Sequence, residues 1–528
     1  MPLPRRGAGA TDGPMRSLLL TLALTGAGLS ASAGAPLSTD LHLDHLPRTE
    51  AEAARIARVV APTTDFSAPE AFETNPAGAA TVRRRNDADA FSLPSASIGF
   101  DGELDFKLGN ALFRKLWVSS PSSTLASDGL GPLYNARSCQ RCHLKDGRGH
   151  VPANDTDSRV SIFLRLSVPA PADAVETRLE AYLASIGIDT PRTRPEPTYG
   201  GQLQDFAIQG HAAEGRMEIT YTQQDVPLSG DEMATLRVPH YAVSRPGYGA
   251  LAEEALLSPR IAPQMIGLGL IEAIPAADIL AHADPDDADG DGISGRPQVA
   301  WSLAQGAPML GRFGWKAGNP TVEEQTAAAF AGDIGISNPL FPEGGGECTL
   351  AQATCRNAVH GDGDARGQEI DRIGLDLVTF YSRNLGVPAR HDVDDPQVLR
   401  GKQVFHDTGC IACHTPKFVT HRLTDRDPQS FQLIWPYSDF LLHDMGEGLA
   451  DNRPEGVATG QEWRTPPLWG VGLTEQVSGH TQFLHDGRAR SLLEAVLWHG
   501  GEAQAQRDAV VAMDPVDRAA LIRFLESL

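Results

Sequence analysis

The sequence predicts a mainly α-helical fold with two similar domains, of which the first is enlarged by insertions with short β-strands. Two observations support this prediction. The pattern Cys-x-x-Cys-His occurs twice, at residues 139–143 and 410–414, and a stretch with helical spacing of apolar residues precedes each copy, at 104–117 and 395–405. Between them, short β-like runs alternate with helical stretches, which indicates insertions into the first domain.

The two Cys-x-x-Cys-His motifs predict two covalently bound haem c groups. In this motif each Cys adds to a vinyl group of the porphyrin, and the His that follows becomes an axial ligand of the iron. A zinc site or a redox dithiol is the alternative, but neither a fourth metal ligand nor a thioredoxin-like unit is evident. We therefore expect two cytochrome c-like haem domains. The expected attachment residues are Cys139, Cys142, His143, Cys410, Cys413 and His414.

The first residues have the pattern of a secretory signal. Arg16 precedes a short apolar run at 17–28, and Ala-Ser-Ala at 31–33 suits cleavage. We expect residues 1–35 to be a signal peptide, with Met15 as an alternative start, and a weak membrane anchor as the alternative role of the same run. The prediction is an exported, periplasmic protein without stable membrane insertion.

The rest of the chain divides into three predicted parts. The terminal segment 514–528 has Asp514 as a helix cap and apolar residues along one face, as the last helix of a cytochrome c domain requires. The parts are an N-terminal extension at 36–95, an N-terminal haem domain with insertions at 96–394, and a C-terminal cytochrome c domain at 395–528.

Composition and charge limit the partners. The 528 residues are 41% hydrophobic, which is enough for two or three cores, and the formal net charge of −22 excludes nucleic acid as a natural partner. The same charge would attract a basic electron-donor protein. The two remaining cysteines, Cys348 and Cys355, lie in a Gly-rich loop, and we expect a local disulfide, with two free thiols as the alternative.

Several segments resemble the di-haem oxidoreductase family of peroxidase-like proteins, some of which carry the label thiol oxidoreductase. The resemblance covers residues 95–528. The thiol label has no physical support here, because the cysteines it would need are those of the haem motifs. The matching segments are DGLGPLYNARSC at 128–139, DGRG at 146–149, IGLGLIEAIP at 266–275, LGRFGWKAG at 310–318 and GEGLAD at 446–451.

The chain is more distantly similar to the bacterial di-haem cytochrome c peroxidases and to the di-haem enzyme that matures methylamine dehydrogenase. This resemblance implies that the N-terminal haem activates peroxide and that the C-terminal haem relays electrons. It also implies Trp315 as an aromatic bridge between the haems, Gln325 as a residue of the peroxide pocket and Asp333 as the acid–base carboxylate. Glu272, which stands in an apolar string, is the alternative carboxylate.

The same resemblance suggests the second axial ligand of the C-terminal haem. His499 follows the His of Phe-Leu-His-Asp-Gly at 483–487 by the 14 residues that separate the ligand from that string in the peroxidases. We therefore expect His499 to bind the second iron, with Met445 as the alternative. For the first iron we expect an open face, although His150 could cap it.

A cation site is predicted at residues 287–292. Asp287, Asp289 and Asp291 alternate before a Gly, as at the start of an EF-hand loop, but the twelfth position is Gln298 and the usual acid is missing. A structural Ca²⁺ is one interpretation, and an acidic turn is the other.

Together these patterns predict a peroxidase-like oxidoreductase with two haem c groups. A small cytochrome, a copper protein or a small-molecule reductant would supply its electrons. An oxygenase that binds dioxygen in an apolar pocket, and a non-catalytic electron carrier with two protein ligands on each iron, are the alternatives.

Overall fold

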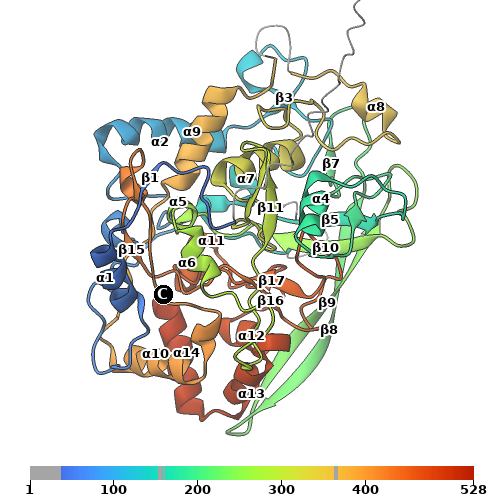
Figure 1. Cartoon of the computed structure of the whole chain (residues 1–528). Coiled ribbons are helices and arrows are strands. Elements are labelled where there is room, and N and C mark those ends of the chain that lie inside the picture. Colours follow the sequence, from blue (N-terminus) through green and yellow to red (C-terminus); the bar gives the residue numbers. More distant parts are fainter. Residues whose placement is uncertain (1–36, 153–156, 158–160, 362–366) are drawn as a thin grey trace, which may run out of the picture. The chain divides into compact units, whose positions relative to one another are not determined.

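Helices and strands share the fold more evenly than the sequence predicted. In the computed structural model, which describes residues 37–152, 157, 161–361 and 367–528, helices make up 30% and strands 19%. The expectation of a mainly α-helical protein is therefore correct only in part. The longest strands form one antiparallel hairpin of β8 (Arg216–Leu228) and β9 (Glu232–Ser244), which pair along their whole length (Figure 1). The sequence predicted only short β-like runs in this part of the chain.

The α-helices of the described residues are mostly short. They are α1 (Glu50–Val60), α2 (Gly99–Arg114), α3 (Cys139–Cys142), α4 (Arg178–Ser185), α5 (Leu268–Glu272), α6 (Ala276–Leu280), α7 (Val322–Ala329), α8 (Ala353–Arg356), α9 (Arg372–Arg383), α10 (Pro396–Asp407), α11 (Thr474–Ser478), α12 (Leu492–Leu497), α13 (Gln504–Ala512) and α14 (Pro515–Ser527).

The remaining strands form small sheets of two strands, apart from one three-stranded sheet in the order β10-β5-β6. They are β1 (His45–Leu46), β2 (Val118–Ser119), β3 (Asp128–Leu130), β4 (Leu133–Tyr134), β5 (Ile162–Pro169), β6 (Thr193–Arg194), β7 (Phe206–Ala207), β10 (Leu256–Ile261), β11 (Val299–Ser302), β12 (Ala307–Leu310), β13 (Phe418–Val419), β14 (Arg422–Leu423), β15 (Leu433–Ile434), β16 (Leu442–Asp444) and β17 (Glu462–Arg464).

Residues from Ala35 onward cluster into one unit. The predicted boundary between two haem domains at residue 395 stays a prediction. The predicted signal peptide lies outside the described residues. Among the residues that are described, no helix has both the length and the apolar character needed to cross a bilayer.

Helices α2 and α9 form the wall behind the first haem motif. They pack closely because a Cβ at Gly109 would collide with the carbonyl oxygen of Leu377. Phe106 and Phe113 of α2 and Tyr381 of α9 fill the interface and belong to one buried cluster. Burial of such aromatic side chains, at about 25 cal/mol per Å² of apolar surface, stabilises this wall.

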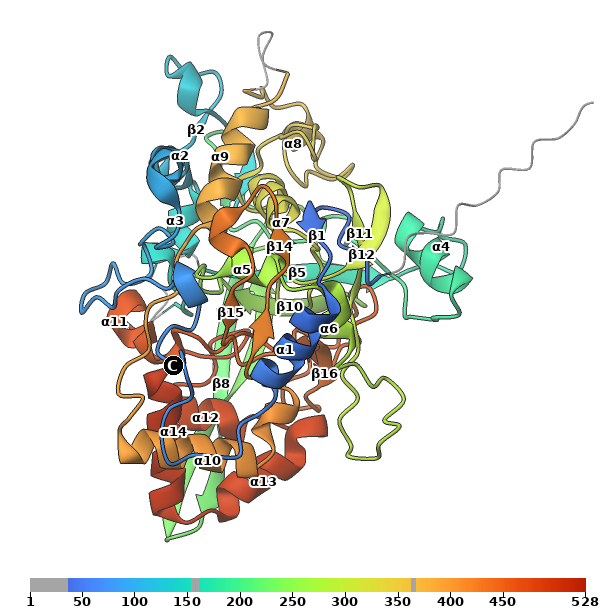
Figure 2. The same ribbon diagram turned by 60° about the vertical axis from the view of Figure 1, so that its left-hand side comes forward.

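Helices α10 and α14 form the corresponding wall for the second motif, and both views show them side by side (Figures 1 and 2). Gly401 allows their contact, since a Cβ there would collide with the carbonyl oxygen of Ala520. Asp514 caps α14 by accepting a hydrogen bond from the backbone N–H of Val516 at 2.9 Å, as predicted. The apolar face predicted for this helix is buried and consists of Leu521, Phe524, Leu525 and Leu528.

The N-terminal extension at 36–95 is more closely packed than a polar composition suggests. Asp40 is buried and its carboxylate accepts a hydrogen bond from Arg312 at 2.6 Å. Glu73 is also buried, and it pairs with Lys402 at 2.8 Å. The composition did not reveal this, because the partner of each acid lies far away in the sequence.

The predicted disulfide between Cys348 and Cys355 is confirmed, with a Cα–Cα distance of 5.8 Å. It joins Cys348, in the loop before α8, to Cys355 within that helix. The link therefore holds the backbone that directly follows Glu347.

Candidate haem sites

Each Cys-x-x-Cys-His motif lines a large cavity of its own. The N-terminal cavity surrounds residues 139–143 and has an empty volume of about 1690 Å³, including the part open to solvent. The C-terminal cavity surrounds residues 410–414 and measures about 1490 Å³ on the same basis. Because each lining contains both cysteines and the histidine of one motif, each cavity is a candidate site for one porphyrin.

The backbone presents both motifs in the same way. The N–H of His143 donates to the carbonyl of Cys139, and the N–H of His414 donates to that of Cys410, each at 3.0 Å. The two cysteines of each motif do not form a disulfide with each other, so both sulfurs can bond to a porphyrin. Burial raises the pKa of Cys139 and of Cys410 to about 12. Since redox dithiols and zinc ligands depend on thiolate, the thiol oxidoreductase label again finds no support.

The two motif histidines are set up as neutral ligands. The Nδ1–H of His143 donates to the carbonyl of Pro263 at 2.8 Å, and that of His414 donates to the carbonyl of Tyr437 at 2.9 Å. These bonds leave Nε2 as the unprotonated nitrogen. Burial lowers the pKa of both imidazoles to about 4, so they are neutral at pH 7. The residues therefore fit haem in both cavities.

Both candidates for the second axial ligand line the C-terminal cavity. His499 lies two residues after the end of α12 and donates its Nδ1–H to the carbonyl of Ala495 at 2.8 Å. This is the arrangement found at His143 and His414. Met445 lines the same cavity. The structure brings both side chains to the cavity, and the imidazole geometry supports His499.

A third histidine of the C-terminal cavity, His443, has both ring nitrogens close to carboxylates. His443 Nδ1 lies 2.7 Å from a carboxylate oxygen of Glu502, and its Nε2 lies 2.8 Å from one of Asp439. Although burial alone would lower the pKa of His443, the two carboxylates raise it well above its ordinary value. A protonated imidazole with two acidic partners has no lone pair to offer a metal.

Two of the predicted peroxide-pocket residues meet in the N-terminal cavity. Asp333 stands in a single π-helical turn at Phe330–Ile334, directly after α7, and such turns are often found at functional sites. Its Oδ1 accepts a hydrogen bond from Gln202 Nε2 at 2.8 Å, and burial raises the pKa of its carboxyl group. Gln325 also lines this cavity and accepts a hydrogen bond from Asn319 at 3.0 Å.

Trp315 lines both cavities. Its indole N–H donates to the carbonyl of Ile261 at 2.8 Å, and its own carbonyl accepts the backbone N–H of Arg464 at 3.0 Å. These bonds fix the indole and its backbone where the cavities adjoin. The residues common to both linings are Arg148, Gln264, Trp315, Arg464, Pro466 and Pro467.

The sequence did not reveal two arginines at this junction. Arg148 and Arg464 line both cavities, and burial lowers the pKa of each to about 10. The Nε–H of Arg148 is buried without a hydrogen-bond partner, and within the described residues neither guanidinium pairs with a carboxylate. Buried cations of this kind require an anion, and the two propionates of a haem have the right charge and donor geometry.

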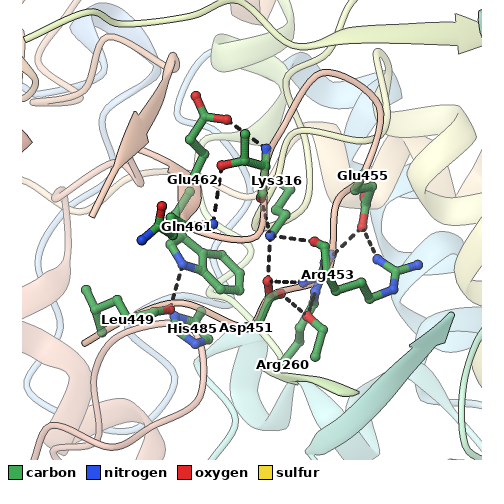
Figure 3. Close-up of polar contacts among 12 residues, drawn as sticks. Arg260, Lys316, Leu449, Asp451, Arg453, Glu455, Gln461, Glu462 and His485 are labelled. Atoms are coloured by element: carbon green, nitrogen blue, oxygen red, sulfur yellow. Dashed lines mark hydrogen bonds and ion pairs between the residues drawn. The ribbon is translucent and has the colours of Figure 1, made fainter. Parts of the chain in front are cut away.

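Lys316, which follows Trp315 in the chain, is held by several polar contacts (Figure 3). Lys316 is fully buried, and its Nζ donates to Asp451 Oδ1 and to the carbonyls of Arg453 and Thr459, each at 2.8 Å. All three ammonium protons are therefore satisfied. The ammonium group also lies 4.6 Å above the ring of Trp463, which lines the C-terminal cavity.

Two other predicted residues lie outside the cavities. Glu272 is fully buried but pairs with Arg383 at 2.6 Å and Arg426 at 2.8 Å. Although burial alone would raise the pKa of Glu272, these arginines lower it to about 2, and the ion pairs account for its position. His150 lines neither cavity, and its Nδ1 lies 3.2 Å from the hydroxyl of Ser161.

The predicted cation loop has a different set of acids close together. Carboxylate oxygens of Asp284, Asp287 and Asp289 lie within 4.8 Å of one another. Asp291 is not among them, and its side chain accepts the backbone N–H of Ile293 at 2.8 Å. Acidic turns of this kind are common without an ion, so the calcium site stays a prediction.

Comparisons with known proteins identify the family of the chain. Residues 72–528 match the profile of a family described as "Di-haem oxidoreductase, putative peroxidase". No curated protein matches the chain. Among solved structures, hydrazine synthase of Kuenenia stuttgartiensis, studied under 20 bar of xenon, is similar over 38% of this chain and 70% of its own, with 18% identity and a TM-score of 0.22. So low a score carries no argument about fold or function.

Proposed function

Since the chain belongs to the di-haem oxidoreductase family, we propose that it reduces hydrogen peroxide in the N-terminal cavity and that the haem of the C-terminal cavity relays the electrons. The observation that carries this proposal is the carboxylate of Asp333 in the wall of the N-terminal cavity. A peroxidase needs a group that takes a proton from one peroxide oxygen and returns it to the other.

The surrounding residues suit that role. When bound, the haem would supply the iron that takes up peroxide and the electrons that split the O–O bond. Gln202 engages Oδ1 of Asp333, so Oδ2 is the atom to which we assign proton transfer. Because burial raises the pKa of Asp333, the carboxyl can also give the proton back to the leaving oxygen.

The two cavities differ in a way that supports a division of labour. In the C-terminal cavity, His499 is oriented as an axial ligand and would leave its iron with two strong ligands, as suits electron transfer. In the N-terminal cavity, His143 is the one histidine among the described lining residues. Trp315, which borders both, is the natural path for electrons between them.

Charged side chains in an otherwise mainly apolar lining favour peroxide over dioxygen as the oxidant. An oxygenase of the rubber-cleaving kind would present an apolar pocket, whereas Asp333, Arg165 and Glu455 all line the N-terminal cavity. We further propose export to the periplasm and a basic cytochrome, a copper protein or a small-molecule reductant as the donor. The net charge of −22 supports a basic protein donor.

Electron paramagnetic resonance on the purified protein with both haems tests the proposal. We expect one low-spin and one high-spin haem at rest, and loss of the high-spin signal when peroxide is added. Consumption of peroxide should then depend on a reductant such as ascorbate or a reduced small cytochrome. Two low-spin signals that persist with peroxide would show an electron carrier instead. Uptake of dioxygen without use of peroxide would show an oxygenase.

A further inference from the structure

A second carboxylate, that of Glu347, lies beside the turn that contains Asp333 and is not used in the proposed mechanism. Glu347 belongs to a glycine-rich loop that folds over the turn containing Asp333. Gly346 has a φ of +61°, and a Cβ there would lie 2.8 Å from the carbonyl oxygen of Ala331 and 2.8 Å from Cα of Gly335. Only glycine allows this approach, so the loop sequence is suited to contact with the Asp333 turn.

Neighbouring residues of one strand-like segment hold the two acids. The backbone N–H of Gly201 donates to Oε2 of Glu347 at 2.9 Å, and the side chain of the next residue, Gln202, donates to Oδ1 of Asp333 at 2.8 Å. From the other side, a Cβ on Gly332 would lie 3.8 Å from Oε1 of Glu347. The Glu347 carboxylate therefore lies close to Gly332, the residue before Asp333, and to Gly201, the residue before the hydrogen-bond partner of Asp333.

The disulfide supports this placement. Cys348, which directly follows Glu347, is joined to Cys355. Within the closed loop, Gln352 accepts the backbone N–H of Thr349 at 2.8 Å and donates to Glu214 at 2.6 Å. A loop without regular structure thus holds one carboxyl group in a defined position.

The charges around the two acids favour retention of a proton. Burial raises the pKa of both Asp333 and Glu347, and the negative charge of Asp333 raises that of Glu347 further. Arg165 is the nearby cation, and it lowers the pKa of both carboxyl groups. Glu214 and Asp205 are the other acids nearby, and burial raises their pKa to about 8 and about 6. Two neighbouring carboxyls in such a place rarely ionise together.

We propose that Glu347 supplies protons to the N-terminal cavity by passing them to Asp333. This inference rests on the proposed peroxide reduction, in which H₂O₂, two protons and two electrons give two molecules of water. The reductant supplies the electrons. In each turnover Asp333 takes one proton from peroxide and gives it to the leaving oxygen, which forms the first water. The oxygen that remains needs two protons, together with the two electrons of the reductant, to form the second water. For each of these protons, the carboxyl of Glu347 protonates Asp333, Asp333 passes the proton on, and the Glu347 carboxylate takes a new proton from water. Glu347 keeps part of its surface exposed to solvent.

The test compares Glu347→Gln with Glu347→Asp and with Glu343→Gln, which changes an exposed acid of the same loop. All are made in the protein with both haems, and unchanged haem spectra and melting temperatures confirm folding. We expect Glu347→Gln to lower kcat for peroxide by about 10- to 100-fold. The alkaline limb of the kcat–pH profile should move to lower pH and the solvent isotope effect should rise. Glu347→Asp should recover part of the activity, and Glu343→Gln should behave as wild type.

Infrared spectroscopy separates this inference from the proposed function. The carbonyl band of a protonated carboxyl in the wild-type protein should shift or weaken in Glu347→Gln and in Asp333→Asn, whether or not the protein turns over peroxide. A wild-type protein that shows this band but does not reduce peroxide would refute the proposed function. It would still support a proton held between Glu347 and Asp333. A Glu347→Gln variant with the wild-type band and the wild-type pH profile would refute proton supply by Glu347.

Discussion

Replacement of Asp333 by Asn changes the N-terminal cavity with little effect on its shape. The Asn side chain has nearly the same volume. Its oxygen can still accept the hydrogen bond from Gln202, which measures 2.8 Å in the wild-type protein. It cannot take up and return a proton. Acid–base catalysis of this kind contributes about 10²- to 10⁴-fold, which corresponds to about 3–5 kcal/mol of the activation barrier. We expect kcat for peroxide reduction to fall by that factor while both haem spectra stay unchanged.

We expect Asp333→Asn to lower activity but not to lower the free energy of unfolding. Burial raises the pKa of Asp333 above 3.8, so the folded state holds this proton more tightly than the unfolded state does. The wild-type protein therefore loses stability as pH rises from about 3.8 through the raised folded-state value, and Asp333→Asn lacks this loss. At pH 7 the variant should be at least as stable as wild type, and the advantage should vanish near pH 3.

Urea unfolding at these two pH values, beside steady-state peroxide assays, checks both expectations. Full activity in the Asn variant would refute the assignment of Asp333. Lower stability at pH 7 together with low activity would show that the carboxylate serves the fold rather than the reaction.

Three further variants test the rest of the site. His499→Ala should remove the low-spin signal of one haem in electron paramagnetic resonance, and an unchanged spectrum would exclude this ligand. Trp315→Phe should slow electron transfer between the haems, measured by stopped-flow absorbance after peroxide addition to the half-reduced protein, without a change in the resting spectra. Lys316→Met should cost about 3–5 kcal/mol of unfolding free energy, because it leaves the buried carboxylate of Asp451 without its partner. The exposed control Lys107→Met should change stability little, as surface pairs contribute about 0–1 kcal/mol.

The haem attachment residues stay a prediction, which the family match and the two cavities support and which the sequence allows because the spacing is dictated by the porphyrin rather than by the fold. The disulfide was predictable for a similar reason, since Cys348 and Cys355 are close in the sequence and the loop that joins them is short. The cap and the apolar face of the last helix followed from periodicity alone. Each of these features is local.

Features that depend on distant residues could not be predicted. Glu272 looked like a catalytic candidate because it is an acid in an apolar string, yet its partners Arg383 and Arg426 lie 111 and 154 residues away. Arg148 and Arg464 likewise stand in segments that give no sign of burial. The length of the β8–β9 hairpin was underestimated because the second half of β8 is largely polar and exposed. Apolar and polar residues therefore alternate only in the first half of this strand.

The junction between the cavities explains why one short motif can support two different roles. Trp315 comes from the part of the chain before residue 395, and Arg464 comes from the part after it, yet the backbone N–H of Arg464 donates to the Trp315 carbonyl at 3.0 Å. The ion pair of Lys316 with Asp451 ties the next residue across the same boundary at 2.8 Å. Electron transfer slows steeply with distance and needs a fixed path, so a bridge held from both sides is better suited to it than one held by a single domain. If electrons pass between the two sites as proposed, the contact between the predicted domains is part of their path.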